Sequence, residues 1–266
     1  MRDDMLNECS IVCADCVEFM RTMSDCSVDL TVTSPPYDNL RSYHDEFDFE
    51  ATARELYRVT KDGGVVVWVK GDQTKNGSES GSSFRQALYF MDIGFKLYDT
   101  MIYQKKNYIP LTHRRYEQSF EYMFVFSKGR PKTFNPIMVP CKGAGKMESY
   151  GSMRRRLVDS KQAMRAPEGI EWKETKAEKI HPNIFAYPCG TRKSGHPAPF
   201  PDKLAEDCVY SWSDAGDVVF DPFVGSGTTA RAALSLGRDF IGCDISEEYC
   251  DMAISSLSDI QDGIEV

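Results

Sequence analysis

The feature that most constrains the fold is a strand that runs into a glycine-rich turn near the C-terminal end. Asp217–Asp221 is apolar enough to be a buried strand, and Asp221–Thr229 (DPFVGSGTT) follows it. Glycine lets the backbone turn tightly, and the pattern predicts a helix over Thr228–Leu236. The next strand, Asp239–Asp244, ends in an acid. Such a strand–turn–helix–strand unit favours a mainly parallel sheet covered by helices.

The same alternation recurs in the rest of the chain. Val65–Val69 is almost entirely apolar, as parallel strands covered on both faces tend to be. The other predicted strands are 11–15, 28–33, 95–103 and 121–126, and the other predicted helices are 16–23, 49–59, a helix ending near 91, 200–212 and a final helix capped by Ser246. The fold class is therefore α/β, with a doubly wound sheet.

One stretch interrupts this regularity. Residues 131–192 lack clear periodicity and are rich in basic residues, proline and glycine. With 266 residues, the chain can form one large domain with a sizeable insertion. We therefore expect a core formed by 1–130 and 193–266 and an insertion at 131–192.

The charge is distributed unevenly. The net charge is −8, yet residues 101–200 hold 19 Lys and Arg against 8 Asp and Glu, while the remainder holds 13 against 32. This contrast predicts a basic surface on an acidic scaffold, as in a protein that binds nucleic acid.

Other features of the composition limit the class of protein. The sequence has no apolar run long enough for a membrane span and no signal peptide, so a cytoplasmic protein of a prokaryotic cell or phage-infected host is expected. Nine cysteines are scattered along the chain, and Cys13-x-x-Cys16 has no second pair to complete a metal site. We expect no metal.

The glycine-rich turn suits a cofactor that contains a nucleoside. The glycines allow close approach of the backbone, the helix start offers N–H groups, and Asp244 can accept hydrogen bonds from ribose hydroxyls. These features fit NAD, FAD or S-adenosylmethionine equally well. A phosphate-binding P-loop is excluded because no lysine follows the second glycine.

A second segment, Ser34–Tyr37 (SPPY), follows a predicted strand. Its prolines stiffen the backbone, its serine and the Pro35 carbonyl offer acceptors, and its tyrosine offers a stacking face. Two acceptors that grip the hydrogens of an aromatic amine can orient the nitrogen lone pair toward an electrophilic methyl group. Proximity and alignment can then supply most of the rate acceleration.

Together, the two segments resemble the amino-directed (N6-adenine or N4-cytosine) DNA methyltransferases of the permuted beta class. The resemblance covers roughly 9–130 and 190–255, with the catalytic motif first and the cofactor motif last. It implies a Rossmann-like, S-adenosylmethionine-dependent methyltransferase fold with a seven-stranded sheet, the last strand antiparallel. It also implies double-stranded DNA as substrate, base flipping, a target-recognition region in the insertion, and a place in restriction-modification.

The resemblance also implies roles for individual residues. The catalytic residues are Ser34, Pro35, Pro36 and Tyr37. The cofactor-binding residues are Asp15, Cys16, Asp221, Phe223, Gly225, Ser226, Gly227, Thr228, Asp244, His196 and Lys203. The candidates for contact with DNA are Arg114, Arg115, Lys142, Lys146, Arg154, Arg155 and Arg156. The two lysines and the run Arg154–Arg156 are candidates for phosphate contacts, because basic side chains pair with phosphates.

Several alternatives stay open at this point. Serine at the first motif position favours cytosine over adenine in this family, but it does not decide the base. An RNA or protein amino methyltransferase and a non-catalytic DNA-binding module are the rival functions. A cytosine-C5 enzyme is disfavoured because Pro140-Cys141-Lys142 and Pro188-Cys189-Gly190 do not match the Pro-Cys-Gln setting of its nucleophile. A homodimer is also left open.

Overall fold

The protein, seen here in a computed structural model, is described over residues 8–36, 48–108, 114–149, 172–189 and 201–261. The chain divides into two compact units. The α/β unit consists of Met1–Asn135 and Asn183–Val266, and the insertion unit consists of Pro136–Pro182. In the described parts of the chain, no helix is long and apolar enough to cross a membrane.

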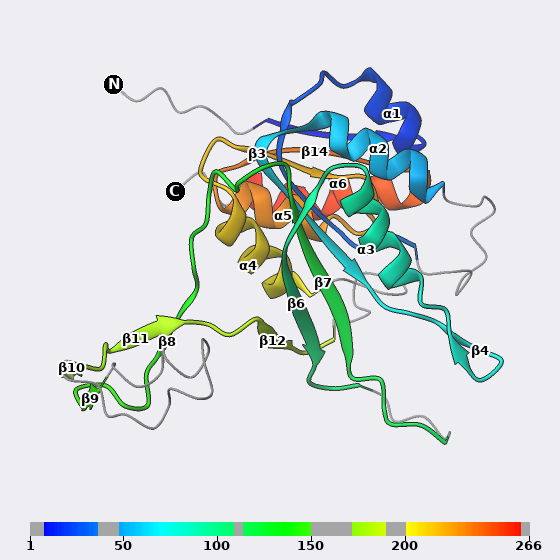
Figure 1. Cartoon of the computed structure of the whole chain (residues 1–266). Helices are drawn as coiled ribbons and strands as arrows, with labels where there is room; N and C mark the ends of the chain where they lie inside the picture. The colour runs from blue at the N-terminus through cyan, green and yellow to red at the C-terminus, as the bar shows by residue number, and fades with distance from the viewer. Residues whose placement is uncertain (1–7, 37–47, 109–113, 150–171, 190–200, 262–266) are drawn as a thin grey trace, which may run out of the picture. The chain divides into compact units, whose positions relative to one another are not determined.

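The α/β unit is built on a twisted sheet that has eight strands within the described residues (Figure 1). In spatial order these are β1 (Cys9–Cys13), β14 (Asp239–Asp244), β13 (Val218–Asp221), β2 (Val28–Thr33), β3 (Thr60–Lys70), β7 (Phe120–Ser127), β6 (Lys96–Lys105) and β12 (Ile184–Tyr187). Only β7 runs antiparallel to its neighbours in this sheet. The predicted α/β class with a mainly parallel sheet is thus confirmed.

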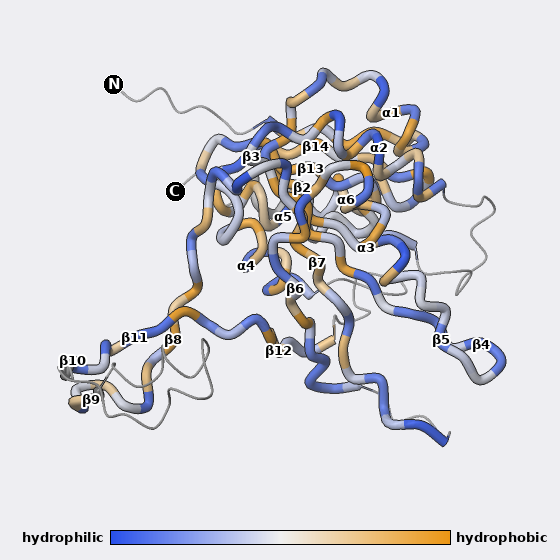
Figure 2. The backbone as a smooth tube through the Cα atoms, in the orientation of Figure 1, coloured by the Kyte–Doolittle hydropathy of each residue, from blue (hydrophilic) through white to orange (hydrophobic). Residues whose placement is uncertain are grey.

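Among the described residues, three helices cover each face of the sheet. One apolar cluster joins α4 (Asp202–Trp212), α5 (Thr228–Ser235) and α6 (Glu247–Gln261) to one face, and another joins α1 (Cys16–Thr22), α2 (Phe49–Val59) and α3 (Ser82–Asp92) to the other. Side chains of a strand point alternately to opposite faces, so a strand covered on both faces is apolar at every position. The tube in Figure 2 shows the central strands as largely hydrophobic.

Trp68 illustrates how tightly one face is filled. Its ring is fully buried and lies edge-on to Phe90, with ring centroids 5.1 Å apart. Its indole N–H would be costly to bury alone, and it donates to Gln86 Oε1 over 3.0 Å. The central strand is thereby fixed against α3.

Most of the predicted core elements lie where the sequence placed them. The predicted bounds of 28–33, 49–59 and 239–244 match β2, α2 and β14. The polar loop after β3 holds a small hairpin, β4 (Thr74–Lys75) and β5 (Ser78–Glu79), which the sequence did not indicate.

The sheet has one strand more than the seven expected. The additional strand, β12, comes from the stretch assigned to the insertion, and it pairs in parallel with β6 (Ile184 opposite Ile102). It was missed because four residues at a sheet edge carry too little periodicity to stand out.

The insertion unit contains two short antiparallel pairs. β8 (Met138–Pro140) pairs with β11 (Glu178–Ile180), and β9 (Met147–Ser149) pairs with β10 (Trp172–Glu174). Strands of three residues bury little apolar surface, so neither pair would be stable by itself in water.

Candidate active site

Of the predicted catalytic and cofactor-binding residues that the structure describes, all but Lys203 lie at the carboxyl ends of neighbouring parallel strands, where ligands bind in open α/β sheets. β13 lies between β14 and β2, with Val219 opposite Leu30 and Phe220 opposite Thr31. The segment that begins at Ser34 and the glycine-rich turn therefore leave the sheet from adjacent strands. Tyr37 itself lies outside the described residues.

A buried hydrogen bond joins these two strand ends. Thr33 Oγ1 donates to Asp221 Oδ1 over 2.7 Å, and the Phe223 N–H donates to the same oxygen over 3.0 Å. Burial raises the pKa of Asp221 to about 6, although the hydrogen bonds from Thr33 and Phe223 oppose that rise. The carboxylate thus holds the start of the glycine-rich turn against the end of β2.

The turn from Asp221 to Gly227 has a backbone conformation that favours glycine at two positions. Gly225 and Gly227 have φ values of +52° and +79°, which favour glycine. A Cβ atom at Gly227 would lie 3.0 Å from the Ala253 Cβ, so a side chain there would press on α6. Ser226 and Thr228 are buried in the same turn, where α5 begins.

Asp244, at the end of β14, has a half-buried carboxylate fixed by the backbone. Its Oδ2 accepts from the Gly225 N–H over 2.9 Å, and its Oδ1 accepts from the Ser246 N–H over 3.0 Å. A carboxylate oxygen can accept more than one hydrogen bond. Asp244 can therefore hold two hydroxyls of a ribose beside the glycine-rich turn, so these residues fit a nucleoside cofactor.

Asp15 and Cys16 lie beside Asp244, because the Ala14 N–H donates to the Asp244 carbonyl over 3.0 Å. Asp15 is exposed and caps α1, with Oδ1 accepting from the N–H groups of Val17 and Glu18. Cys16 points into the protein, with its Sγ 3.5 Å from Thr52 Oγ1. Burial raises the pKa of this thiol to about 11, so Cys16 is a neutral thiol near pH 7.

Other predicted residues lie in different settings. Lys203 is on α4, where its Nζ lies 2.8 Å from Asp207 and 3.6 Å from Glu206. Arg115 reaches the β4–β5 hairpin, donating to the Gly77 carbonyl. Arg114 is exposed and Lys142 and Lys146 lie in the insertion unit. His196 and Arg154, Arg155 and Arg156 lie outside the described residues.

A residue that the sequence did not single out is Lys70, the last residue of β3. Its side chain is fully buried, and its Nζ donates to the Pro36 carbonyl over 3.3 Å. A lysine directly after five apolar residues usually marks the exposed end of a strand, so the sequence alone did not indicate that this side chain is buried. Within the described residues, no group of three or more His, Cys, Asp or Glu side chains could hold a metal.

Comparisons with known proteins identify relatives of this chain. The N6/N4 methyltransferase family model, described as DNA methylase, matches residues 28–255. The orphan methyltransferase M.BamHII of Bacillus amyloliquefaciens is 51% identical over 246 residues, which cover 88% of this chain and 90% of that protein.

Solved structures share the fold at lower identity. The M1.HpyAVI-SAM complex has a TM-score of 0.61 at 22% identity, with 94% of this chain and all of that chain covered. The PvuII DNA methyltransferase (cytosine-N4-specific) has a TM-score of 0.66 at 19% identity, covering 96% of this chain and 92% of its own.

Replacing Asp244 by alanine should weaken the binding of S-adenosylmethionine. If Asp244 accepts both ribose hydroxyls, the substitution removes two hydrogen bonds to a charged acceptor, so we expect the Kd to rise by at least about tenfold, as measured by titration calorimetry. Asp239→Ala is the matched control, because Asp239 lies at the opposite end of β14 and accepts from the Glu8 N–H. An unchanged Kd for Asp244→Ala would show that the ribose-binding acid was misassigned.

The raised pKa of Asp221 predicts a pH-dependent stability. The folded state binds this proton more tightly than the unfolded chain, whose carboxyl titrates near 3.8. The contribution of Asp221 to the free energy of unfolding is therefore greatest below that pH and is lost as pH rises through about 6. Relative to Asp221→Asn, the wild-type free energy of unfolding should fall by roughly 3 kcal/mol between pH 4 and pH 7. Urea unfolding at several pH values tests this, and parallel profiles for the two proteins would contradict it.

Proposed function

Because the chain belongs to the N6/N4 DNA methylase family, we propose specific parts for its residues in moving a methyl group from S-adenosylmethionine to an exocyclic amino group of a base in DNA. The observation that carries the proposal is the 2.7 Å hydrogen bond from Thr33 to Asp221. It fixes the segment that would hold the amine directly beside the turn that would hold the methyl donor.

The cofactor half of the proposed site is the edge formed by β1, β13 and β14. Asp244 would accept the ribose hydroxyls, and Asp15 and Cys16 would border the adenine. The turn around Gly225 and its neighbours would pass close to the cofactor, with His196 and Lys203 toward its methionine end. S-adenosylmethionine, when bound, supplies a methyl group on a positively charged sulfur, which is already electrophilic.

The amine half is the segment that follows β2. The Ser34 hydroxyl and the Pro35 carbonyl would accept the two amino hydrogens, and so direct the nitrogen lone pair at the methyl carbon. Pro35 and Pro36 stiffen the segment, and Tyr37 would stack on the ring of the flipped base. With the lone pair so directed, the nitrogen would take the methyl group as the bond from that group to sulfur is lost, and the methylated nitrogen would release one proton to solvent.

Of the two candidate bases, we favour cytosine, with N4 as the methylated atom. Ser34 stands where cytosine enzymes of this family commonly carry serine, and the PvuII enzyme of the same fold is described as cytosine-N4-specific. Sequencing of DNA methylated by the purified protein, with detection of modified bases, tests this. N6-methyladenine in the product would reverse the assignment.

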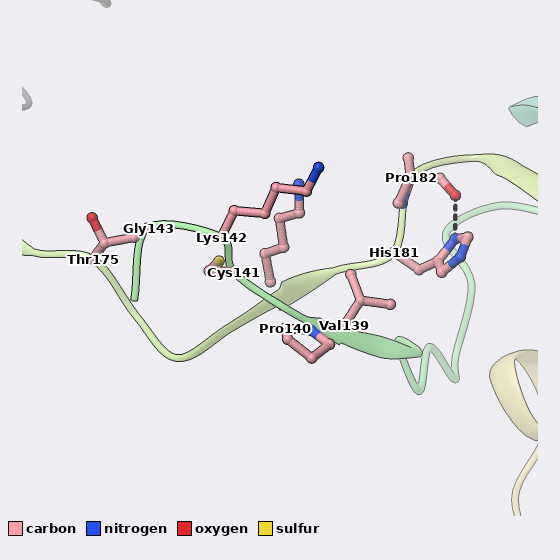
Figure 3. A pocket seen from close by; sticks show the side chains of 9 residues that line it. Val139, Pro140, Cys141, Lys142, Gly143, Thr175, His181 and Pro182 are labelled. Atoms are coloured by element: carbon pink, nitrogen blue, oxygen red, sulfur yellow. Dashed lines mark hydrogen bonds between the residues drawn. The ribbon is translucent and has the colours of Figure 1, made fainter. Parts of the chain in front are cut away.

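The insertion unit is the proposed target-recognition region. It contains a cavity of about 480 Å³ whose lining includes Lys142, Lys179, Thr175 and His181 (Figure 3). Neither lysine forms an ion pair with a carboxylate in the described part of the chain, and both are exposed. Two ammonium groups at one cavity without a carboxylate favour an anion, and in a DNA methylase that anion would be a backbone phosphate.

Arg114, Arg115, Lys146 and the run Arg154–Arg156 are further candidates for phosphate contacts, based on charge alone. Because the relative that is 51% identical comes from a bacterium, we place the protein in the cytoplasm of a prokaryotic or phage-infected cell.

Tyr37→Ala should reduce methylation strongly while S-adenosylmethionine still binds. Stacking of a base on an aromatic ring contributes about 1–3 kcal/mol, so kcat/KM for DNA should fall by roughly 5- to 150-fold. Tyr37→Phe keeps the ring and should stay near wild type. Equal activity of the alanine and phenylalanine variants would remove the stacking role.

Replacing Lys142 and Lys179 together by glutamate should weaken DNA binding at every sequence. Each lost phosphate contact should also make the negative slope of log K against log salt shallower by about 0.9, as measured by fluorescence anisotropy. Lys176→Glu is the matched control, because Lys176 is exposed in the same unit but does not line the cavity. Weakened binding at one sequence only would indicate base reading instead of phosphate contact.

A further inference from the structure

Lys70 is an unusual residue for its position. It ends a strand whose five preceding residues are buried and apolar, and its own side chain has 0% exposure. Removing an ammonium group from water is costly unless hydrogen bonds and charges compensate for it. Such a group marks a place where the fold has a specific use for a donor.

The donor is directed at the predicted catalytic segment. β2 and β3 run side by side in parallel with Thr33 opposite Trp68, so the same register, continued by two residues, brings Lys70 level with Pro35. From there its Nζ donates to the Pro36 carbonyl oxygen over 3.3 Å. Pro36 is half-buried, so the hydrogen bond lies at the rim of the site.

The segment needs a donor of this kind. Proline has no N–H, so neither Pro35 nor Pro36 can be tied to the neighbouring strand as a donor. The carbonyls are the backbone groups that can be held. The Pro36 carbonyl also belongs to the peptide plane that leads to Tyr37, and a donor on that oxygen fixes the direction in which the chain leaves.

The chain beyond Lys70 is itself fixed. The Asp72 carboxylate accepts hydrogen bonds from Ser80 Oγ and Ser82 Oγ, at 3.0 and 3.1 Å, and from the Ser83 N–H at 3.0 Å. On the other side of the strand, Lys70 is opposite Tyr122 of β7. Lys70 is therefore a donor on a rigid support, as precise positioning of a site requires.

We propose that Lys70 is a positioning residue for methyl transfer, which holds the Ser34–Pro36 segment through the Pro36 carbonyl and so aligns its acceptors with the methyl donor. The inference rests on the proposed function of that segment. Lys70 acts through the segment and does not itself touch the base.

The test compares Lys70→Met and Lys70→Gln with the wild type in single-turnover methylation. Methionine fills similar space but donates nothing, and glutamine keeps an N–H donor without the charge. We expect the single-turnover rate of Lys70→Met to fall at least tenfold, with the Kd values for S-adenosylmethionine and for DNA changed less than twofold. Lys70→Gln should recover part of that rate.

Lys61→Met is the matched control. Lys61 is on the same strand, its Nζ pairs with Asp29 at 2.5 Å, and it lies at the opposite end from the catalytic segment. Its methylation rate should stay within twofold of the wild type.

The remaining outcomes overturn the proposal in distinguishable ways. A normal rate for Lys70→Met in an otherwise active enzyme removes the positioning role and leaves the proposed function intact. A joint loss of thermal stability, cofactor affinity and rate in both Lys70 variants would assign the residue a purely structural part. A wild-type protein that methylates no DNA would overturn the proposed function together with this inference.

Discussion

The site depends on the buried hydrogen bond between Thr33 and Asp221, two residues 188 positions apart in the sequence. Burying a charged carboxylate away from water is unfavourable, and the raised pKa of Asp221 reflects that cost. Hydrogen bonds from the Thr33 hydroxyl and the Phe223 N–H offset the cost of burying the Asp221 carboxylate. Thr33 ends β2, whereas Phe223 belongs to the glycine-rich turn. Asp221 thus stabilises one relative position of β2 and the glycine-rich turn.

The rest of the α/β unit makes that position rigid. Val65, Val67 and Val69 belong to one apolar cluster, while Val66 and Trp68 belong to the other. A central strand that is dry on both faces offers few places for polar side chains within its length. Polar groups therefore appear where the strands end, and Lys70, Asp221 and Asp244 all lie at such ends.

Much of the fold was predictable because its signals are local. The apolar run before Lys70, the turn at Gly225 and the strand that ends in Asp244 can be recognised from neighbouring residues alone, and the order of the two motifs pointed to the family. β12 was not predictable, since pairing with β6 is what makes Ile184–Tyr187 a strand. Lys70 was overlooked for a related reason: burial of a lysine depends on what surrounds it.

The sequence by itself determined the succession of strands and helices, the chemistry of the two motifs and the basic character of the insertion. Only the tertiary structure decided which strand ends are neighbours. The spatial order β1, β14, β13, β2, β3 differs from the order along the chain, because it results from burying both faces of the sheet at once. That packing brings Ala14 to Asp244, Thr33 to Asp221 and the Lys70 ammonium to the Pro36 carbonyl, contacts between residues that no local pattern relates.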